Sequence, residues 1–433
     1  MAGVALLDRR ARPVTDGAAV PTQGPVTRSS VVRVGAATVI SALCGYAVLY
    51  LAARNLEPAG FSVFAVFWGA FGLLAGAANG LLQESTREVR QARQSHLQDR
   101  PPDGPRIHPM WVAALVGVVS AAVVAASAPL WSGHVFVDAR WLSVGLLSAG
   151  IAGFCMHATL LGVLAGVNGW SQYGSLIVGD AIGRVAVATA TFLVGWGLVG
   201  YLWATVAGSV AWLVLLSASP TTRAAARLRT PGTMITFLRG ASHSIAAAGA
   251  SAVLIMGFPV LLKATSADLG AAGGVVILAV TLTRAPLLVP LTAMQGNLIA
   301  HFVDQRERRL RSLVAPVAIL AVLGGAAVLV AGLLGPWLLR TAFGPDYQAG
   351  GALLAWFTTA AVAIALLTLT GAATVAAAMH RAYATGWIGA TLASILLLLL
   401  PWPLETRTVV ALLCGPLVGI AVHVVALARI PAA

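Results

Sequence analysis

The sequence has few charged residues. They make up 9% of its 433 positions, whereas an ordinary soluble domain carries about 25%, and 59% of the residues are hydrophobic. No soluble fold could bury so much apolar surface. Several apolar runs reach the roughly 20 residues that a membrane-spanning helix needs. A helix satisfies its backbone hydrogen bonds within one segment, so the sequence predicts an all-α polytopic membrane protein.

Cysteine and the motifs of soluble enzymes are also scarce. The three cysteines, Cys44, Cys155 and Cys414, each lie inside an apolar run, which indicates small buried hydrophobic residues rather than disulfides or metal ligands. We find no Walker loop, zinc-ligand spacing, nucleophile elbow or glycine-rich dinucleotide turn. No segment between the apolar runs exceeds about 30 residues, which leaves no room for a soluble catalytic domain. We therefore predict a protein that is not an enzyme and has no cofactor or metal site.

Lysine is nearly absent, and arginine supplies 26 of the 27 basic residues. The net charge of +13 would favour a nucleic-acid partner in a soluble protein. Here the arginines lie mainly at the ends of apolar runs, which is typical of a membrane topology signal. We expect no nucleic-acid partner.

Apolar runs between charged or Pro/Gly breaks predict about twelve spans. They lie near 31–53, 60–82, 111–131, 141–166, 173–196, 198–219, 236–262, 271–297, 313–339, 350–378, 382–403 and 408–428. Six spans precede a basic segment and six follow it, which predicts two six-helix bundles around a central cavity. The expected divisions are a disordered cytoplasmic tail (1–28), an N-terminal bundle (29–219), a basic cytoplasmic linker (220–235) and a C-terminal bundle (236–433).

The positions of the basic residues predict the orientation. With the N-terminus in the cytoplasm, 20 basic residues fall on the cytoplasmic side and five on the outer side, while Arg184 and Arg284 fall within spans. Short cytoplasmic loops carry such an excess of Arg and Lys. We expect a protein of the inner (plasma) membrane with both termini in the cytoplasm.

Three ionisable residues lie at membrane depth, where each costs about 2.5–3.5 kcal/mol on insertion scales. Asp180 and Arg184 are four residues apart and share one helix face. They form either a self-neutralising pair or a cavity-facing cation with an orienting or proton-accepting neighbour. Arg284 has no ionisable neighbour on its own helix and is followed by Pro286 and Pro290. It either binds a ligand or pairs with Asp180 across the two halves.

Other residues in the spans are less specific. Asn79 and Gln295 lie toward the cytoplasmic ends of their spans, where they line an entrance or are ordinary polar helix ends. His157, His243 and His423 either relay protons or donate interhelical hydrogen bonds. Small residues at four-residue spacing, as in Gly72 and Gly76, predict close helix packing.

The stretch LAARNLEPAGFSVFAVFWGAFGLLAGAANGLLQESTREV, residues 51–89, resembles the second-helix region of polysaccharide and lipid-linked oligosaccharide flippases. In that family a basic residue ends the first span, a Pro-x-Gly-aromatic turn starts the second, and a polar, basic segment ends it. The matching residues here are Arg54, Pro58, Gly60, Phe61, Gln83, Glu84 and Arg87. The similarity of individual residues covers about 40 positions, and the similarity of architecture covers the whole chain.

This resemblance implies membership of the multidrug/oligosaccharidyl-lipid/polysaccharide exporter superfamily, with a V-shaped pair of bundles and alternating access. It implies a substrate that is a polyprenyl-phosphate- or pyrophosphate-linked sugar. Arg184 and Arg284 suit its phosphates, because a guanidinium binds phosphate bidentately and keeps its charge. The expected partners are the lipid-linked glycan, membrane lipids and envelope glycosyltransferases.

Three other functions remain open. The chain could carry a small solute or drug, or it could organise envelope glycosyltransferases as a membrane scaffold that transports nothing. A membrane-embedded glycosyltransferase would need acidic residues in a sizeable first outer loop. That loop is only Arg54 to Ala59, with the single acid Glu57.

Overall fold

The computed structural model describes residues 28–97, 104–294, 298, 301–302, 305 and 309–429. The predicted tail therefore lies outside the described residues, apart from Arg28, where the first helix begins. Gln295 also lies outside them.

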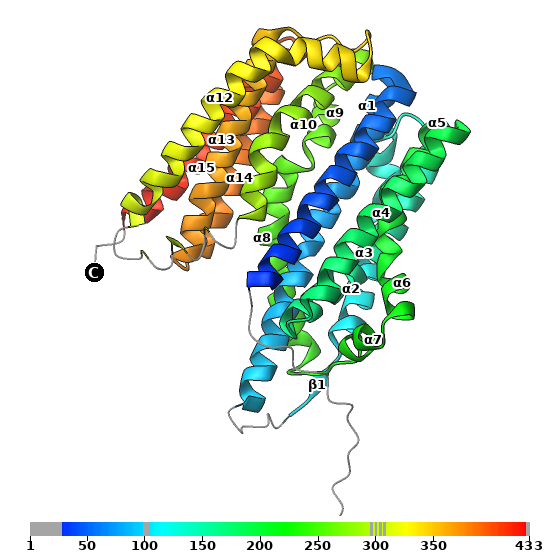
Figure 1. Ribbon diagram of the computed structural model, residues 1–433, viewed down its shortest axis with the longest axis vertical. Coiled ribbons are helices and arrows are strands. Elements are labelled where there is room, and N and C mark those ends of the chain that lie inside the picture. Colours follow the sequence, from blue (N-terminus) through cyan, green and yellow to red (C-terminus); the bar gives the residue numbers. More distant parts are fainter. Residues whose placement is uncertain are drawn as a thin grey trace, which may run out of the picture.

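The described chain is almost entirely helical (Figure 1). The first half comprises α1 (Arg28–Leu97), β1 (Arg106–Ile107), α2 (Pro109–Val135), α3 (Arg140–Gly166), α4 (Trp170–Val194), α5 (Gly197–Ala207), the 3₁₀ helix η1 (Gly208–Val210), α6 (Ala211–Ala218) and α7 (Pro220–Ala226). The second half follows β2 (Thr230–Pro231) and comprises α8 (Met234–Ile255), α9 (Phe258–Ala264), α10 (Gly270–Ala293), α12 (Arg309–Phe343), α13 (Gly351–Ala376), α14 (His380–Leu398) and α15 (Leu404–Ala428).

The helices account for the predicted spans. In the described residues ten helices are long and apolar enough to cross a membrane, and α8 with α9 forms one further, bent span. The long helix α1 is two helices joined at Glu57, where φ is 55° and ψ is 171°. Counting its two arms separately gives the twelve spans that the sequence predicts. The prediction of an all-α polytopic fold is confirmed, and the chain is a multi-pass membrane protein.

Two breaks in the helices lie next to a proline, one between the two arms of α1 and one within a single span. Glu57 precedes Pro58, and a residue before proline disfavours the α-helical conformation. The second break separates α8 from α9, which are bent by 67° at Gly257 and Pro259. Proline has no backbone N–H to continue the helical hydrogen-bond pattern.

The two halves meet along α1 (Figure 1). This helix packs against α3 and α4 of its own half and against α8, α9 and α10 of the other. Within the second half, α13 contacts α10, α12, α14 and α15. Figure 1 shows α12 to α15 as one slanting group on the far side of α10 from α1. The predicted arrangement of two helical bundles is confirmed.

Glycines on α1 let the second half approach closely, and we call them the glycine seam: Gly69, Gly72, Gly76 and Gly80. A Cβ atom added at Gly69 or Gly72 would meet Met256, one at Gly76 would meet Ala252, and one at Gly80 would meet the backbone of Ile245. Small residues at this spacing allow helix backbones to pack tightly in a membrane. The packing predicted for Gly72 and Gly76 is confirmed.

The predicted linker, 220–235, is structured. It contains α7 and the strand β2, which pairs antiparallel with β1, with Arg106 opposite Pro231 and Ile107 opposite Thr230. Beside this pairing, the Gly232 N–H donates to the Pro105 carbonyl oxygen at 2.9 Å. This pairing of two-residue strands, which we call the clip, joins the loop before α2 to the segment before α8. It was not predicted from the sequence.

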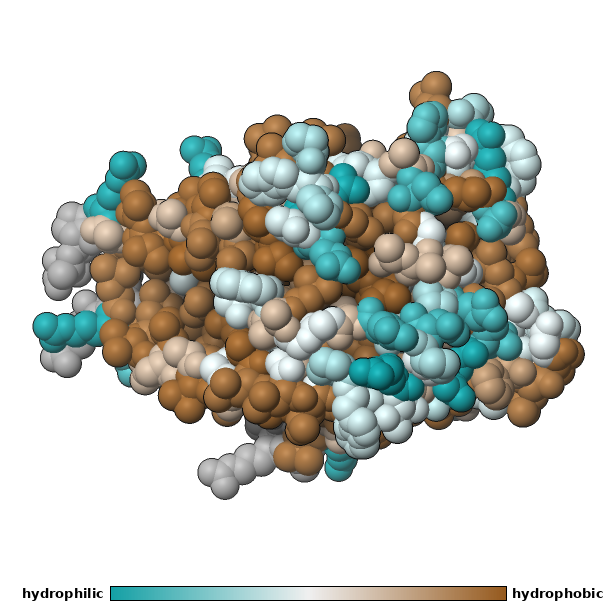
Figure 2. Space-filling model, turned by 90° about the horizontal axis from the view of Figure 1, so that it is seen from above, coloured by the Kyte–Doolittle hydropathy of each residue, from teal (hydrophilic) through white to brown (hydrophobic). Residues whose placement is uncertain are grey.

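Hydrophobic side chains also face outward. Leu130, Leu193 and Leu333 are each more than 75% exposed, as lipid-facing residues in a membrane protein are. Figure 2 shows hydrophobic residues over much of one end of the molecule, with hydrophilic residues gathered in patches.

All three cysteines are free, but only Cys155 is buried, so the prediction of burial is wrong for Cys414, which is exposed.

Candidate functional site

A cavity of about 250 Å³ lies between α1, the α8–α9 break and α10. Because α1 belongs to the first half and the other helices to the second, the cavity lies between the two halves. Its lining residues are Thr38, Ala42, Tyr46, Trp68, Ile255, Met256, Phe258, Pro259, Ile277, Val280, Thr281, Arg284, Leu288, Val289 and Thr292. Arg284 is the one charged residue among them.

Arg284 is only 7% exposed and has an incomplete set of partners. Its Nη1 donates to the carbonyl oxygen of Ile255 at 3.2 Å, and its Cζ lies 5.2 Å from the ring centroid of Phe258. Its Nη2 is buried and has no hydrogen-bond partner. No ion pair involves Arg284 within the described part of the chain. A buried charged donor without a partner is costly, which marks this side chain as a candidate ligand-binding group.

Arg284 contacts the second half's broken span for a physical reason. The carbonyl of Ile255 would ordinarily accept the N–H of residue 259, four positions later, but that residue is Pro259. The C-terminal end of α8 also carries the partial negative charge of the helix dipole, which favours a cation there. Arg284 therefore partly satisfies a carbonyl that the chain leaves open.

Asp180 and Arg184 pair with each other on α4. The distance from Arg184 Nη2 to Asp180 Oδ1 is 3.0 Å. The guanidinium also lies over two aromatic rings, with its Cζ 5.9 Å from Trp68 and 5.3 Å from Phe71. The alternative in which Arg284 pairs with Asp180 is therefore wrong, and Asp180 and Arg184 form the self-neutralising pair.

Of the predicted site residues that the structure describes, one lines the cavity of about 250 Å³. Arg284 lines the cavity described above, whereas Asn79, Asp180 and Arg184 do not. Asn79 is partly buried on α1. Trp68 lies between the two cationic positions, because it lines the cavity of Arg284 and also contacts Arg184.

Four polar residues that were not predicted from the sequence line the cavity beside Arg284. Thr38 and Tyr46 lie eight residues apart on α1, and Thr281 and Thr292 lie on α10 with Arg284. A signal was available, because residues three, four or eight apart lie on one face of a helix. Polar residues at such spacings in an apolar span would have indicated a shared lining.

The histidines do not form a proton relay in the described residues. His423 contacts the Thr370 hydroxyl through Nδ1 at 3.0 Å and the Tyr383 carbonyl through Nε2 at 3.3 Å. This confirms the interhelical hydrogen-bond interpretation for His423. His157 is buried and stacks on Phe154, and its Nδ1 has no hydrogen-bond partner.

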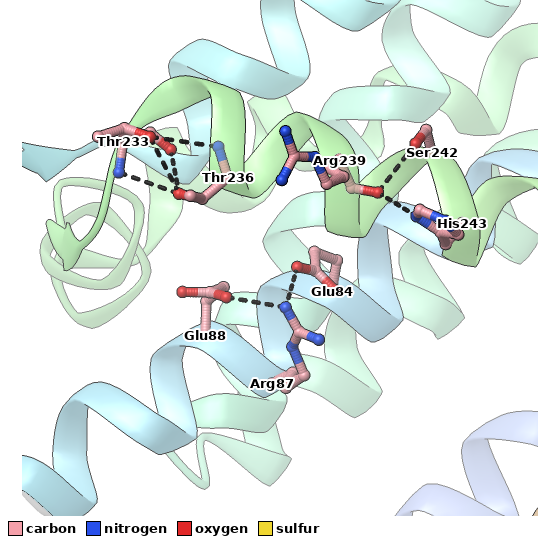
Figure 3. A network of polar contacts seen from close by, with 8 residues as sticks. All are labelled: Glu84, Arg87, Glu88, Thr233, Thr236, Arg239, Ser242 and His243. Carbon is pink, nitrogen blue, oxygen red and sulfur yellow. Dashed lines mark hydrogen bonds and ion pairs between the residues drawn. The ribbon is translucent and has the colours of Figure 1, made fainter.

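A cluster of charged residues on α1 lies against α8 at one end of the interface between the halves (Figure 3). Glu84 of α1 is 2% exposed and accepts a hydrogen bond from Arg87 Nη2 at 2.6 Å. Arg87 also pairs with Glu88 at 3.1 Å. A Cβ atom at Gly240 of α8 would collide with the Glu84 carboxylate. The backbone of α8 therefore passes directly over this carboxylate.

A second cavity, of about 500 Å³, lies between α10, α12 and α13. Its polar lining residues, Thr283 and Thr358, bond to backbone carbonyls of their own helices. It therefore offers no free polar group to an anion. Within the described ranges, no group of three His, Cys, Asp or Glu side chains is placed to hold a metal ion.

Comparison with known proteins gives relatives that match nearly the whole chain, while no family model matches it. The uncharacterized protein Mb3654 of Mycobacterium bovis is 69% identical over 413 residues, which are 95% of each chain. In Mycobacterium tuberculosis, the uncharacterized protein Rv3630 is 68% identical over 95% of each chain. There, Rv1510 is 66% identical over 98% of this chain and 97% of its own.

Solved structures share the fold. An inward-facing multidrug resistance MATE family transporter of the MOP superfamily aligns with a TM-score of 0.70 over 92% of this chain and 98% of its own, at 15% identity. An outward-facing MATE transporter gives 0.64, with 92% and 95% coverage and 16% identity. A MOP superfamily transporter from Pyrococcus furiosus gives 0.63, with the same coverage and identity. The chain has the fold of these transporters, and it belongs to the protein family that includes Mb3654, Rv3630 and Rv1510.

Proposed function

We propose that this chain is an alternating-access transporter of the plasma membrane that moves a lipid-linked phosphate compound outward. The compound we favour is a polyprenyl-phosphate- or pyrophosphate-linked sugar or oligosaccharide for envelope polysaccharide synthesis. The fold supports transport, because solved transporters of this fold include both an inward-facing and an outward-facing state. The resemblance of residues 51–89 to polysaccharide flippases supports the substrate class.

The observation that carries the proposal is Arg284 in its cavity. A guanidinium that is 7% exposed, with one buried nitrogen lacking a partner, faces a cavity between the two halves. Arginine stays charged in apolar surroundings and binds phosphate through two parallel N–H donors. The remaining lining is apolar apart from a few hydroxyl groups, which suits an anionic head group attached to a hydrocarbon chain.

The same lining argues against a carrier for cationic drugs. Such a ligand would meet the positive charge of Arg284, and none of the residues that line this cavity is acidic to offset it. Asp180 lies outside the lining and is already paired with Arg184. The MOP superfamily transporter from Pyrococcus furiosus has a binding pocket of reversed polarity, which suggests a different function for that protein. It offers a precedent for a change of pocket charge within this fold.

Binding of polyprenyl phosphate to the purified protein tests the proposal, with polyprenol, which lacks the phosphate, as the matched ligand. We expect Arg284→Gln to weaken polyprenyl phosphate binding by roughly tenfold or more, the effect of losing about 1.5–3 kcal/mol from a charged hydrogen bond. Arg284→Lys should restore binding in part, because it keeps the charge but loses the fork. Arg340→Gln, which removes an exposed arginine, is the control.

Two results would contradict the proposal. One is equal affinity of the wild-type protein for polyprenol and polyprenyl phosphate. The other is an Arg284→Gln variant that binds the phosphate as tightly as the wild type. In cells, depletion of the protein should make a lipid-linked sugar accumulate in the inner leaflet. Co-purification with envelope glycosyltransferases would test the predicted partners.

A further inference from the structure

We infer that the hydrogen bond from Arg284 to the Ile255 carbonyl, which we call the latch, stabilises the bend between α8 and α9. An anion bound in the cavity competes with this carbonyl for the guanidinium. Occupancy of the cavity thereby changes the bend of the second half's first span. The identity of the anion rests on the proposed function. The latch itself rests on the contacts of Arg284.

The backbone carbonyl of Ile255 has no helical hydrogen-bond donor. Pro259 cannot donate to the oxygen of Ile255, so the last turn of α8 lacks one of its helical hydrogen bonds. In the described chain the amide of Phe258, three positions after Ile255, does not donate to this oxygen either, which leaves it to a side-chain donor. Arg284 Nη1 is that donor, from the neighbouring span at 3.2 Å.

The two terminal nitrogens of the Arg284 guanidinium have different surroundings. Nη1 is engaged with the carbonyl while Nη2 has no partner. A bidentate phosphate needs two parallel N–H donors from one fork. A phosphate in the cavity attracts the whole guanidinium more strongly than the neutral Ile255 carbonyl does, because a charged acceptor makes the stronger hydrogen bond. Turning the fork toward the cavity then lengthens the bond from Nη1 to Ile255.

The break between α8 and α9 packs against α1 of the first half. A Cβ atom at Gly69 would lie 3.1 Å from both the Met256 carbonyl oxygen and the Pro259 ring, and one at Gly72 would lie 3.3 Å from Met256 Cβ. The break is therefore seated directly on the glycine seam of α1. A change in the angle between α8 and α9 must shift this contact, so ligand occupancy is transmitted to the surface where the two halves meet.

Spin labels on either side of the break test the latch without ligand. Both Ser242 of α8 and Ala264 of α9 are exposed, and cysteines placed there in a background without the three native cysteines would carry the labels. We expect Arg284→Gln to shift or broaden the distance distribution between the labels. The control, Thr281→Val, alters the same cavity at a hydroxyl that bonds within its own helix.

Pro259→Ala supplies the missing N–H. We expect α8 and α9 to straighten and the wild-type Arg284, released from the carbonyl, to bind polyprenyl phosphate roughly three- to tenfold more tightly, the worth of one hydrogen bond. In an Arg284→Gln background, Pro259→Ala should leave the weak affinity unchanged. The control is Pro416→Ala, at a buried proline inside α15.

The outcomes separate the latch from the proposed function. An unchanged label distance in Arg284→Gln overturns the latch, whether or not a lipid phosphate binds. If Pro259→Ala folds, unchanged affinity in this variant also overturns the latch. By contrast, failure of the wild-type protein to bind polyprenyl phosphate overturns the proposed function. The distances measured without ligand still decide on the latch in that case.

Discussion

Asp180 and Arg184 form an ion pair one helical turn apart on α4, with 3.0 Å between Oδ1 and Nη2 and each side chain about 15% exposed. The pair sits under Gly208, where an added Cβ would collide with the carboxylate. Each charge therefore depends on the other inside a tightly packed region, and removing one leaves its partner buried alone.

The ion pair predicts a specific pattern of stability. Asp180→Asn and Arg184→Gln should each lower the free energy of unfolding by about 1–3 kcal/mol, because each leaves a largely buried charge without its partner. The double variant should recover part of that loss. The measurement is the midpoint of thermal unfolding in detergent. Additive losses in the double variant would contradict this dependence.

The glycine seam predicts a second effect. Gly80→Ala should destabilise this conformation by about 1–3 kcal/mol, because the new Cβ would overlap the backbone of Ile245. A backbone cannot move aside as the end of a flexible side chain can. We expect a lower thermal midpoint and faster maleimide reaction of a cysteine placed at Ser244. The control is Gly45→Ala on the same helix, where nothing lies within 4 Å of the added atom. Equal effects of the two variants would show that the seam contributes nothing.

Two tyrosines give a matched test of the packing of α1 next to its kink at Glu57. The hydroxyl of Tyr347, from the second half, donates to the Ala53 carbonyl at 3.0 Å, and that of Tyr201, from the first half, donates to the Leu51 carbonyl at 3.0 Å. Tyr347→Phe and Tyr201→Phe should each cost about 0.5–1.5 kcal/mol, measured by thermal unfolding.

Of these two bonds, only that of Tyr347 joins the two halves. We therefore expect Tyr347→Phe, and not Tyr201→Phe, to increase labelling of a cysteine at Tyr50, which contacts Phe343 near this bond. Equal labelling in the two variants would mean that the Tyr347 bond does not hold the two halves together beside the kink.

The predicted orientation is tested by cysteine labelling in a background without native cysteines. A cysteine at Ala267, between α9 and α10, should react with an impermeant maleimide in intact cells. One at Arg227, in the segment before α8, should react only after permeabilisation. Both positions are exposed. Ser266 is a poorer choice than Ala267, because its hydroxyl accepts a hydrogen bond from Arg407. The reverse labelling pattern would overturn the prediction from the positive-inside rule.

The spans were predictable because the length of an apolar run has a direct physical meaning in a bilayer. The break between α8 and α9 was not, although Gly257 and Pro259 lie inside the predicted span at 236–262. A proline in a membrane helix is often tolerated with a modest kink, because neighbouring groups satisfy the freed carbonyl. Whether the span bends by 67° or less depends on contacts that the sequence does not contain.

The candidate site was predicted in part. The cost of a mid-membrane charge identified Arg284, and four-residue spacing identified Asp180 with Arg184. The principal partner of Arg284 could not be predicted, because it is a backbone carbonyl and every residue has one. The clip of β1 and β2 was missed for a similar reason, because two-residue strands leave no periodic pattern.

The clip also limits how the two halves can move. Its backbone pairing attaches Thr230 and Pro231 to the loop before α2. The N–H of Gly232 also donates a hydrogen bond to the Pro105 carbonyl oxygen in that loop. The Thr233 side chain already caps the first turn of α8. Almost no free chain is left between the two attachments, so the second half cannot slide away from the first at this point. It can only rotate about it, and Gly232, with φ of 125°, is the residue best able to serve as the pivot.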